Sequence, residues 1–206
     1  MNKETLISKL EKGRAEFAYK CVQENLINLK PFEFYSEKFL EDAIAVIKET
    51  ITNKMKKDIE KNKITEKRIK ELLNSPYEFS LKNKYQNLSD EEKRVIDFYK
   101  NLLKNYRSYI KKIPTMILSN GLGQTLAFIK AKSEKGNAYD LIYKQLTEYM
   151  KSPYTTRMKM PNDKKDLIDW VISCDSTDYR YITQEILAFL NWLKRFAEGL
   201  IEEEEE

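Results

Sequence analysis

Apolar residues return every three or four positions along most of this 206-residue chain, and this spacing restricts its fold more than any other feature. It is the period of an α-helix that buries one face against its neighbours. No segment alternates strictly between apolar and polar residues as a half-buried strand does, and only five Gly and five Pro interrupt the pattern. The sequence therefore predicts an all-α protein, a compact bundle of about six to eight helices.

Local signals mark where most of these helices begin and end. Ser89 and Glu92 have the spacing of a capping box, and Ser36 and Thr65 are expected N-caps. Pro114 predicts a kink or a break in the long helix that Ser89 begins. The expected helices cover 4–29, a segment after Ser36, 65–73, 89 onward, 122–132, a segment after Gly136, a short segment from Asp163, and a last segment capped by Asp175–Asp178.

The length suits one domain with a sizeable core, which we place at residues 1–201, followed by an acidic tail at 202–206. The formal charge is +4, but without the five glutamates of the tail 37 basic residues face 28 acidic ones, a balance of +9. Between Lys48 and Lys112 there are 18 basic and 10 acidic residues. This excess indicates an anionic partner, most simply nucleic acid, although lysines also form ordinary solvated helix faces.

The chain contains no histidine, which removes the commonest general base and metal ligand and excludes Ser–His and Cys–His catalysis. Cys21 and Cys174 are too far apart in sequence for a zinc motif and are expected to pack as small buried groups. No window holds about 18 uninterrupted apolar residues, so we expect no membrane span and a cytoplasmic location.

The stretch Ser119–Phe128, SNGLGQTLAF, has the glycine content of a phosphate-binding turn but lacks the rest of the motif. No Lys-Ser/Thr pair follows at Walker spacing, and Leu126 stands where a dinucleotide turn needs its third glycine. Asn120 and Gly121 instead suit the end of a helix, with Gly123 allowing the next helix to approach a neighbour. The stretch is therefore interpreted as a joint between two helices.

Asp163, Asp166 and Asp169 lie close to one predicted helix face and form the only cluster that suggests a hard cation. Carboxylates in a first helical turn more often stabilise the helix dipole, so we expect no catalytic residue, no metal and no cofactor. Among the aromatic residues, those at helical spacing are expected in the core: Phe128, Trp170, Phe189, Trp192 and Phe196.

Basic residues on the same helices are better placed to meet phosphate, although each alone can equally be a surface charge or an ion-pair partner. The candidate RNA-binding residues are Arg14, Lys111, Lys112, Lys130, Lys132, Arg180, Lys194 and Arg195.

Three segments together resemble a known family: EKGRAEFAYKCV (11–22), YIKKIPTMILSNGLGQTLAFIKAKS (109–133) and YRYITQEILAFLNWLKRFAEGL (179–200). The chain is similar to the fifth subunit of the Cmr assembly, the small subunit of the type III-B CRISPR RNA-targeting complex. The central segment is the most specific of the three. The region from about Lys30 to Glu92 has no counterpart in shorter members, so residues 1–29 and 93–201 are taken as the core and 30–92 as a helical insertion.

The resemblance implies a non-catalytic, all-α subunit of antiviral defence. Such a subunit stacks with other copies beside the backbone subunits and meets target RNA, alone or paired with the guide, through basic helix surfaces. The alternative is an interaction scaffold that holds the complex together through its apolar helix faces without touching nucleic acid.

Overall fold

The computed structural model describes residues 6–28, 39–155 and 158–202. Within these ranges the chain forms eleven α-helices and one π-helix, and no strand. Eight of the α-helices have seven or more residues, so the predicted all-α bundle is confirmed. In order they are α1 (Leu6–Lys20), η1 (Cys21–Ile27), α2 (Phe39–Lys54), α3 (Lys56–Glu60), α4 (Glu66–Asn74), α5 (Pro76–Ser80), α6 (Lys82–Tyr85), α7 (Asp90–Asn120), α8 (Leu122–Lys132), α9 (Ala138–Lys151), α10 (Leu167–Ser173) and α11 (Ser176–Leu200).

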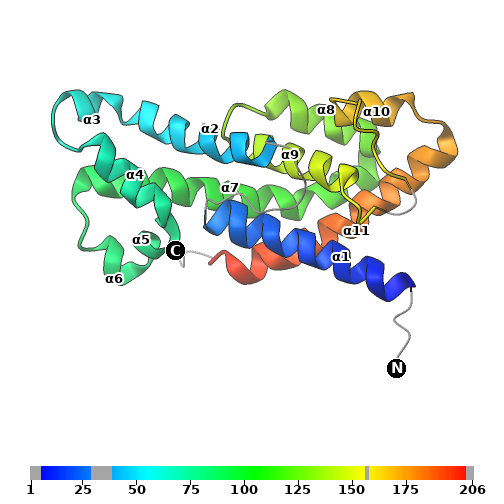
Figure 1. Cartoon of the computed structure of the whole chain (residues 1–206), viewed down its shortest axis with the longest axis horizontal. Coiled ribbons are helices and arrows are strands. Elements are labelled where there is room, and N and C mark those ends of the chain that lie inside the picture. Colours follow the sequence, from blue (N-terminus) through cyan, green and yellow to red (C-terminus); the bar gives the residue numbers. More distant parts are fainter. Residues whose placement is uncertain (1–5, 29–38, 156–157, 203–206) are drawn as a thin grey trace.

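The long helix α7 runs along the middle of the elongated molecule (Figure 1). In that view α11 packs below it, with α1 packed against α11, and α2 and α9 lie above it. The short helices α3 to α6 gather around the start of α7, and α8 and α10 lie at its far end. Because α7 touches helices on several sides, it is the element that orders the rest of the bundle.

The core is continuous along the described chain. The rings of Tyr149 and Phe189 stack at 3.9 Å, and Phe17 meets both rings edge-on. The buried residues Ile47 of α2 and Leu72 of α4 belong to the same hydrophobic cluster. The helices between residues 39 and 85 therefore share one apolar core with α7, α9 and α11.

Side-chain caps fix several helix starts as predicted. The Ser89 hydroxyl accepts from the backbone N–H of Glu92, and the Glu92 carboxylate accepts from the backbone N–H of Ser89. Thr65 caps α4 and Asp175 caps α11 in the same manner. The expected cap Ser36 lies outside the described residues. α7 then continues through Pro114 without a break, because a proline removes only one backbone donor while Ile113 and Ile117 stay buried.

The glycine stretch is a joint between two helices, as interpreted. Gly121 has φ +83°, ends α7 by donating its N–H to the Ile117 carbonyl at 2.9 Å, and precedes α8. The N–H of Gly123 donates to the hydroxyl of Tyr179 at 2.9 Å. This bond links the joint to the first turn of α11, so it holds the end of α7 close to the start of α11.

Several finer predictions were wrong. Phe128 was expected in the core but is 38% exposed, because it lies on the outer face of α8 with its edge against Tyr139. Trp192 and Phe196 are only half-buried, whereas Trp170 and Phe189 are buried. The helix expected from Asp163 begins at Leu167, because it is the Asp166 side chain that caps it.

Two local structures were not expected. The segment after Asn74 contains the short helices α5 and α6 rather than only a polar loop. The first helix changes into the π-helix η1 at Cys21, where side chains from two other helices satisfy its carbonyl groups. Tyr99 of α7 donates to the Ile27 carbonyl at 3.1 Å, and Gln145 of α9 donates to the Cys21 carbonyl at 3.2 Å.

Candidate nucleic-acid interface

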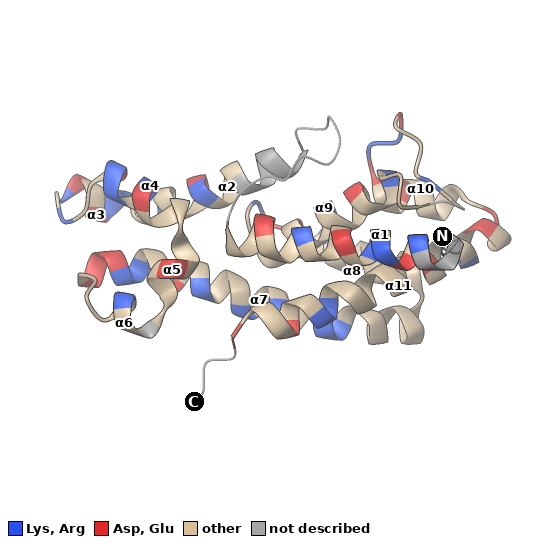
Figure 2. Cartoon of the chain, turned by 60° about the horizontal axis from the view of Figure 1, so that its bottom comes forward, with Lys and Arg blue, Asp and Glu red and all other residues tan. Residues whose placement is uncertain are grey.

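Five cations lie on one face of α7, and we call this set the α7 stripe. Its members are Lys93, Lys100, Lys104, Arg107 and Lys111. Their separations of seven, four, three and four residues keep them on one side of a helix with 3.6 residues per turn. At 1.5 Å per residue the stripe is about 27 Å long. Figure 2 shows basic segments following one another along α7.

The five side chains of the α7 stripe are fully or partly exposed, with the Nε atom of Arg107 buried. Lys104 and Lys111 are exposed, and the other three side chains are partly exposed. The Nζ atom of Lys100 lies 4.2 Å from the centre of the Tyr85 ring. The Tyr85 hydroxyl donates to Asp97, the acidic residue at the edge of the stripe, at 2.7 Å. Tyr85 of α6 therefore places its ring against Lys100 and holds the carboxylate of Asp97 beside the cations.

At its far end the stripe meets α11. The Nζ atom of Lys111 lies 3.8 Å from Oε1 of Glu198, and Lys194 precedes Glu198 by one helical turn. The predicted residues Lys111 and Lys194 thus lie on adjoining helix faces. Lys112 is also exposed but points about 100° away from the stripe.

Arg195 and Arg180 lie elsewhere on α11. The Arg195 guanidinium sits 5.5 Å from the Trp192 ring, whose Nε1 donates to Glu11 of α1 at 2.7 Å. Arg180 is exposed in the first turn of α11, next to the residue that bonds the glycine joint. Both arginines are therefore separate from the α7 stripe.

The predicted residues of α8, Lys130 and Lys132, lie near the other end of α7 and, being two positions apart, point to nearly opposite sides of their helix. Lys130 pairs with Asp166, which caps α10 by accepting from the backbone N–H of Ile168 at 3.1 Å. The hydrogen bond to Asp166 raises the pKa of Lys130. Burial opposes ionisation of Asp166, but hydrogen bonds from Lys130 and Tyr143 lower its pKa overall. Lys132 is exposed nearby.

Arg14 is placed differently from all the others. Its side chain is only 13% exposed and donates two hydrogen bonds to the Glu185 carboxylate and one to Glu11. The hydrogen bonds to Glu185 raise the pKa of Arg14 despite its partial burial. Tyr149 also donates to Glu185, so the group joins α1, α9 and α11 in the interior.

The structure therefore does not bring all eight predicted residues together. It adds four stripe cations that the sequence reasoning did not single out: Lys93, Lys100, Lys104 and Arg107. The signal that identifies them is their spacing, read on the helix that begins at Ser89. Looking for short basic clusters favoured adjacent pairs, which point to different sides of a helix.

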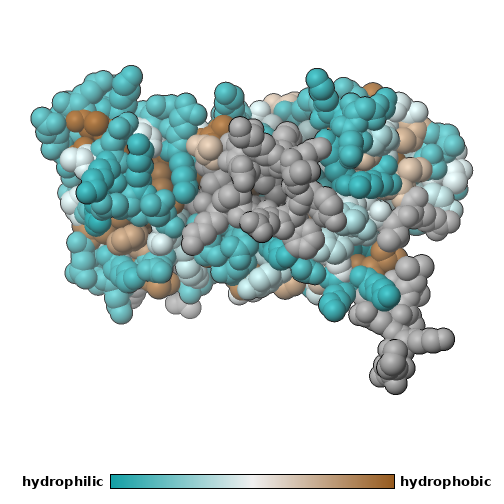
Figure 3. All heavy atoms as spheres, in the orientation of Figure 1, coloured by the Kyte–Doolittle hydropathy of each residue, from teal (hydrophilic) through white to brown (hydrophobic). Residues whose placement is uncertain are grey.

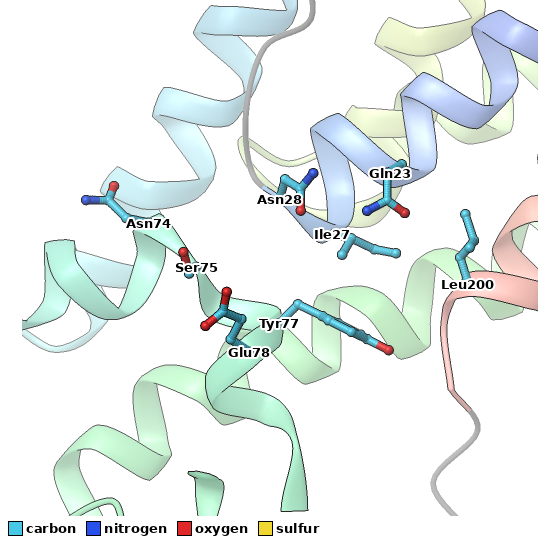
Figure 4. A pocket seen from close by; sticks show the side chains of 8 residues that line it. All are labelled: Gln23, Ile27, Asn28, Asn74, Ser75, Tyr77, Glu78 and Leu200. Atoms are coloured by element: carbon cyan, nitrogen blue, oxygen red, sulfur yellow. The ribbon is translucent and has the colours of Figure 1, made fainter.

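Two pockets are formed by the described residues. A pocket of about 300 Å³ lies between the end of η1, the α4–α5 junction and the end of α11 (Figure 4). Its described lining comprises Gln23, Ile27, Asn28, Asn74, Ser75, Tyr77, Glu78 and Leu200. Glu78 is exposed, and a hydrogen bond from Lys84 lowers its pKa. A second pocket of about 460 Å³ between α2 and α4 is lined by two lysines, two glutamates, two asparagines, one threonine and one leucine.

Asp163, Asp166 and Asp169, which are close in sequence, differ in their surroundings. Asp166 is engaged as the cap of α10, while Asp163 and Asp169 are exposed. Over the described ranges, no three His, Cys, Asp or Glu side chains come together as a metal site. None of the helices in those ranges combines the length and the apolar character needed to cross a membrane. The described part of the face in Figure 3 is mainly hydrophilic, with small separate apolar spots.

The part of the chain that includes the α7 stripe matches a known protein family. The family model described as CRISPR-associated protein (Cas_Cmr5) matches residues 80–200, from the end of α5 to the end of α11. The curated protein "CRISPR system Cmr subunit Cmr5" from Thermus thermophilus is 29% identical over 98 residues. The aligned part covers 48% of this chain and 76% of that protein.

Proposed function

The chain belongs to the Cmr5 family of CRISPR-associated proteins, and on that premise we propose that it is a non-catalytic subunit of a type III-B Cmr complex in antiviral defence. In this role it stacks with other copies beside the backbone subunits. It contacts target RNA, alone or paired with the guide, through the α7 stripe, with Lys194 extending the contact. The single observation that carries the RNA contact is the alignment of five cations along one open helix face.

The proposed mechanism is electrostatic. Lysine and arginine side chains neutralise phosphates and release counterions, which favours binding without reading bases. Sequence selection belongs to the guide, which pairs with the target. One copy neutralises few phosphates and binds weakly, whereas stacked copies gain from their high effective concentration on one strand. The lack of histidine agrees with a subunit that holds RNA while other subunits cut it.

The remaining predicted cations have secondary places in this proposal. Lys112, Lys130, Lys132, Arg180 and Arg195 offer contacts to neighbouring subunits or to more distant parts of the strand. Arg14 is already held by two carboxylates, so we assign it to the fold rather than to the RNA surface. We also propose that residues 30–92 are an insertion into a core formed by 1–29 and 93–201. The family match begins at residue 80, so it leaves α2 to α4 outside it together with α1 and η1, and it includes residues 80–92.

The test is a salt titration of RNA binding. Fluorescence anisotropy of a labelled 30-nucleotide oligouridylate should give a slope of log affinity against log salt of about −3 to −4 for five phosphate contacts on a single strand. The double variant Lys104→Glu and Lys111→Glu should weaken binding by at least about tenfold at low salt and make the slope shallower by about 1 to 1.5. An RNA of mixed sequence should bind with similar affinity.

A matched control changes the same net charge elsewhere. Lys67→Glu with Lys70→Glu alters two exposed lysines of α4, away from the stripe, and should change affinity much less. Equal losses in both variants would mean that only net charge matters. A flat salt dependence, or a strong preference for one sequence, would contradict the electrostatic mechanism directly.

One observation favours the scaffold alternative. Leu118 is 75% exposed and Ile172 is 65% exposed, and Ile172 lies against the glycine joint at the far end of α7. Exposed apolar side chains of this size suit a protein contact. Under that alternative, the assembled complex would keep its RNA after Lys194→Glu and Arg195→Glu, whereas Leu118→Ser and Ile172→Ser would release this subunit.

A further inference from the structure

The end of α11 lies beside the α7 stripe. Glu198 is within 3.8 Å of Lys111, and both Figure 1 and Figure 2 place the end of α11 next to the middle of α7. Ile201, which follows the helix, is 3% exposed, and its N–H donates to the Ala197 carbonyl at 3.2 Å. The chain is therefore anchored in the core at the point where it leaves α11, close to the cations.

Five glutamates follow this anchor, Glu202–Glu206, of which Glu202 is within the described residues. Burial and the Glu202 carboxylate raise the pKa of Tyr77, so Glu202 faces α5, which packs on α7. The four residues after Glu202 can extend by at most about 13 Å. Lys104 and Lys111 are seven residues apart on α7, or about 10 Å. The extended length of the run therefore matches about two turns of the stripe.

We propose that the acidic run Glu202–Glu206 is an internal competitor that pairs with the α7 stripe when RNA is absent and is displaced when RNA binds. The inference rests on the proposed function, since it describes regulation of the same basic surface. Carboxylates and phosphates are both anionic oxygen acceptors for lysine and arginine. Because the run is tethered next to the stripe, its effective concentration is in the millimolar range, although each exposed ion pair is weak.

The expected consequence is discrimination by length. A short or isolated anion does not outweigh a tethered run of five charges, whereas a long RNA that crosses several stacked copies does. The subunit would thereby resist scattered binding to small polyanions. It would still bind an RNA strand that other subunits of the complex already hold.

The position of the run is tested without RNA by disulfide trapping. The exposed residue Asn101 lies beside the stripe and carries no charge, so Asn101→Cys with Glu204→Cys keeps all five cations. The matched control is Gln184→Cys with Glu204→Cys, because Gln184 lies 18 residues before Glu202, about 25 Å along α11 and beyond reach of the run. Both pairs are built on Cys174→Ser, with Cys21 left buried.

We expect the Asn101 pair to form its disulfide about tenfold faster than the Gln184 pair at low salt. This excess should disappear near 1 M salt, where the screening length falls to about 3 Å. Equal rates for the two pairs at low salt would overturn the proposal.

Competition is tested with the labelled oligouridylate. Changing all five glutamates of the run to Gln should raise RNA affinity about three- to tenfold at low salt, with the ratio approaching one as salt rises. The matched control removes five exposed acidic charges elsewhere: Glu49→Gln, Glu60→Gln, Glu134→Gln, Asp163→Asn and Asp169→Asn. An equal gain in the control would reduce the effect to net charge and overturn the inference.

The two failures are distinguishable. If neither the wild type nor any variant binds RNA, the proposed function fails, and the trapping rates still decide whether the run occupies the stripe. If RNA binds but removal of the run changes nothing, the proposed function stands and the internal competitor does not.

Discussion

Arg14 and Glu185 are joined by two hydrogen bonds, from Nε to Oε1 at 2.9 Å and from Nη2 to Oε2 at 2.7 Å. The pair links α1 to α11 across 171 residues of sequence, with both side chains less than 15% exposed. A bidentate arginine–carboxylate pair fixes the relative angle of two helices as well as their charges. Tyr149 donates a further hydrogen bond to the same carboxylate from α9.

Breaking this pair should destabilise the fold. Arg14→Ala leaves Glu185 partly buried without its cation, and we expect a loss of about 2 to 4 kcal/mol in the free energy of unfolding. Urea denaturation followed by circular dichroism measures it. Arg180→Ala, at an exposed position, should change stability by no more than about 0.5 kcal/mol. The opposite pattern, weaker RNA binding by Arg14→Ala with unchanged stability, would restore Arg14 as an RNA contact.

Asp166 should make stability sensitive to acid. Burial works against its ionisation, but the hydrogen bonds from Lys130 and Tyr143 lower its pKa in the folded state. The unfolded chain, with an aspartate pKa near 3.9, therefore binds this proton first as pH falls. The stabilisation is complete above about pH 4 and disappears as pH drops through the lower folded pKa.

The measurement compares wild type with Asp166→Asn, which keeps a capping side chain and removes the charge. At pH 7 the variant should be less stable by about 1 kcal/mol, and the gap should narrow as pH falls below about 4, the pKa of an aspartate in the unfolded chain. Urea midpoints taken across this range report it. A gap that stays constant with pH would show that the charge of Asp166 contributes nothing. Lys164→Ala, an exposed change near the same helix, serves as the control.

The helices were predictable from sequence because their signals are local. The capping box, the glycine joint and the three- and four-residue spacing all act within a few positions, and α8 was found at its predicted bounds, Leu122–Lys132. The π-helix was not predictable, because Tyr99 and Gln145 satisfy its carbonyls from 72 and 124 residues away. Phe128 failed for a related reason, since helical spacing cannot say which face of α8 has a neighbour.

In the candidate site, too, local spacing can be seen in the sequence, whereas contacts between distant residues cannot. Of the α7 stripe only Lys111 was predicted, although the spacing of its other four cations is visible in the sequence of α7. The partners of Arg14 and Lys130 are carboxylates that only the tertiary fold brings near: Glu185 is 171 residues from Arg14, and Asp166 is 36 residues from Lys130. A basic residue in a sequence carries no mark of whether its partner is an internal acid or an external phosphate. Sequence therefore gives the number of cations, and packing decides which are available.

The glycine joint offers a comparison between two identical substitutions. Gly121 has φ +83°, where a β-carbon strains the backbone, so Gly121→Ala should destabilise the protein by about 1 to 2 kcal/mol. Gly199 lies in the last turn of α11, and a β-carbon placed there would have no neighbouring atom within 4 Å. Gly199→Ala should therefore stabilise the protein by about 0.5 to 1 kcal/mol through helix propensity.

A second substitution at Gly121 tests whether the penalty comes from backbone strain or from a steric clash. Tyr179 lies 3.5 Å from where a β-carbon on Gly121 would stand, an ordinary contact, so the expected penalty comes from the backbone angle and not from a clash. Because ψ is 160°, Gly121 lies outside the left-handed helical region that asparagine tolerates and in one that is nearly confined to glycine, so Gly121→Asn should lose about as much stability as Gly121→Ala. Thermal unfolding of the three variants measures this order. If Gly121→Asn were clearly more stable than Gly121→Ala, backbone strain at this φ and ψ would not be the cause.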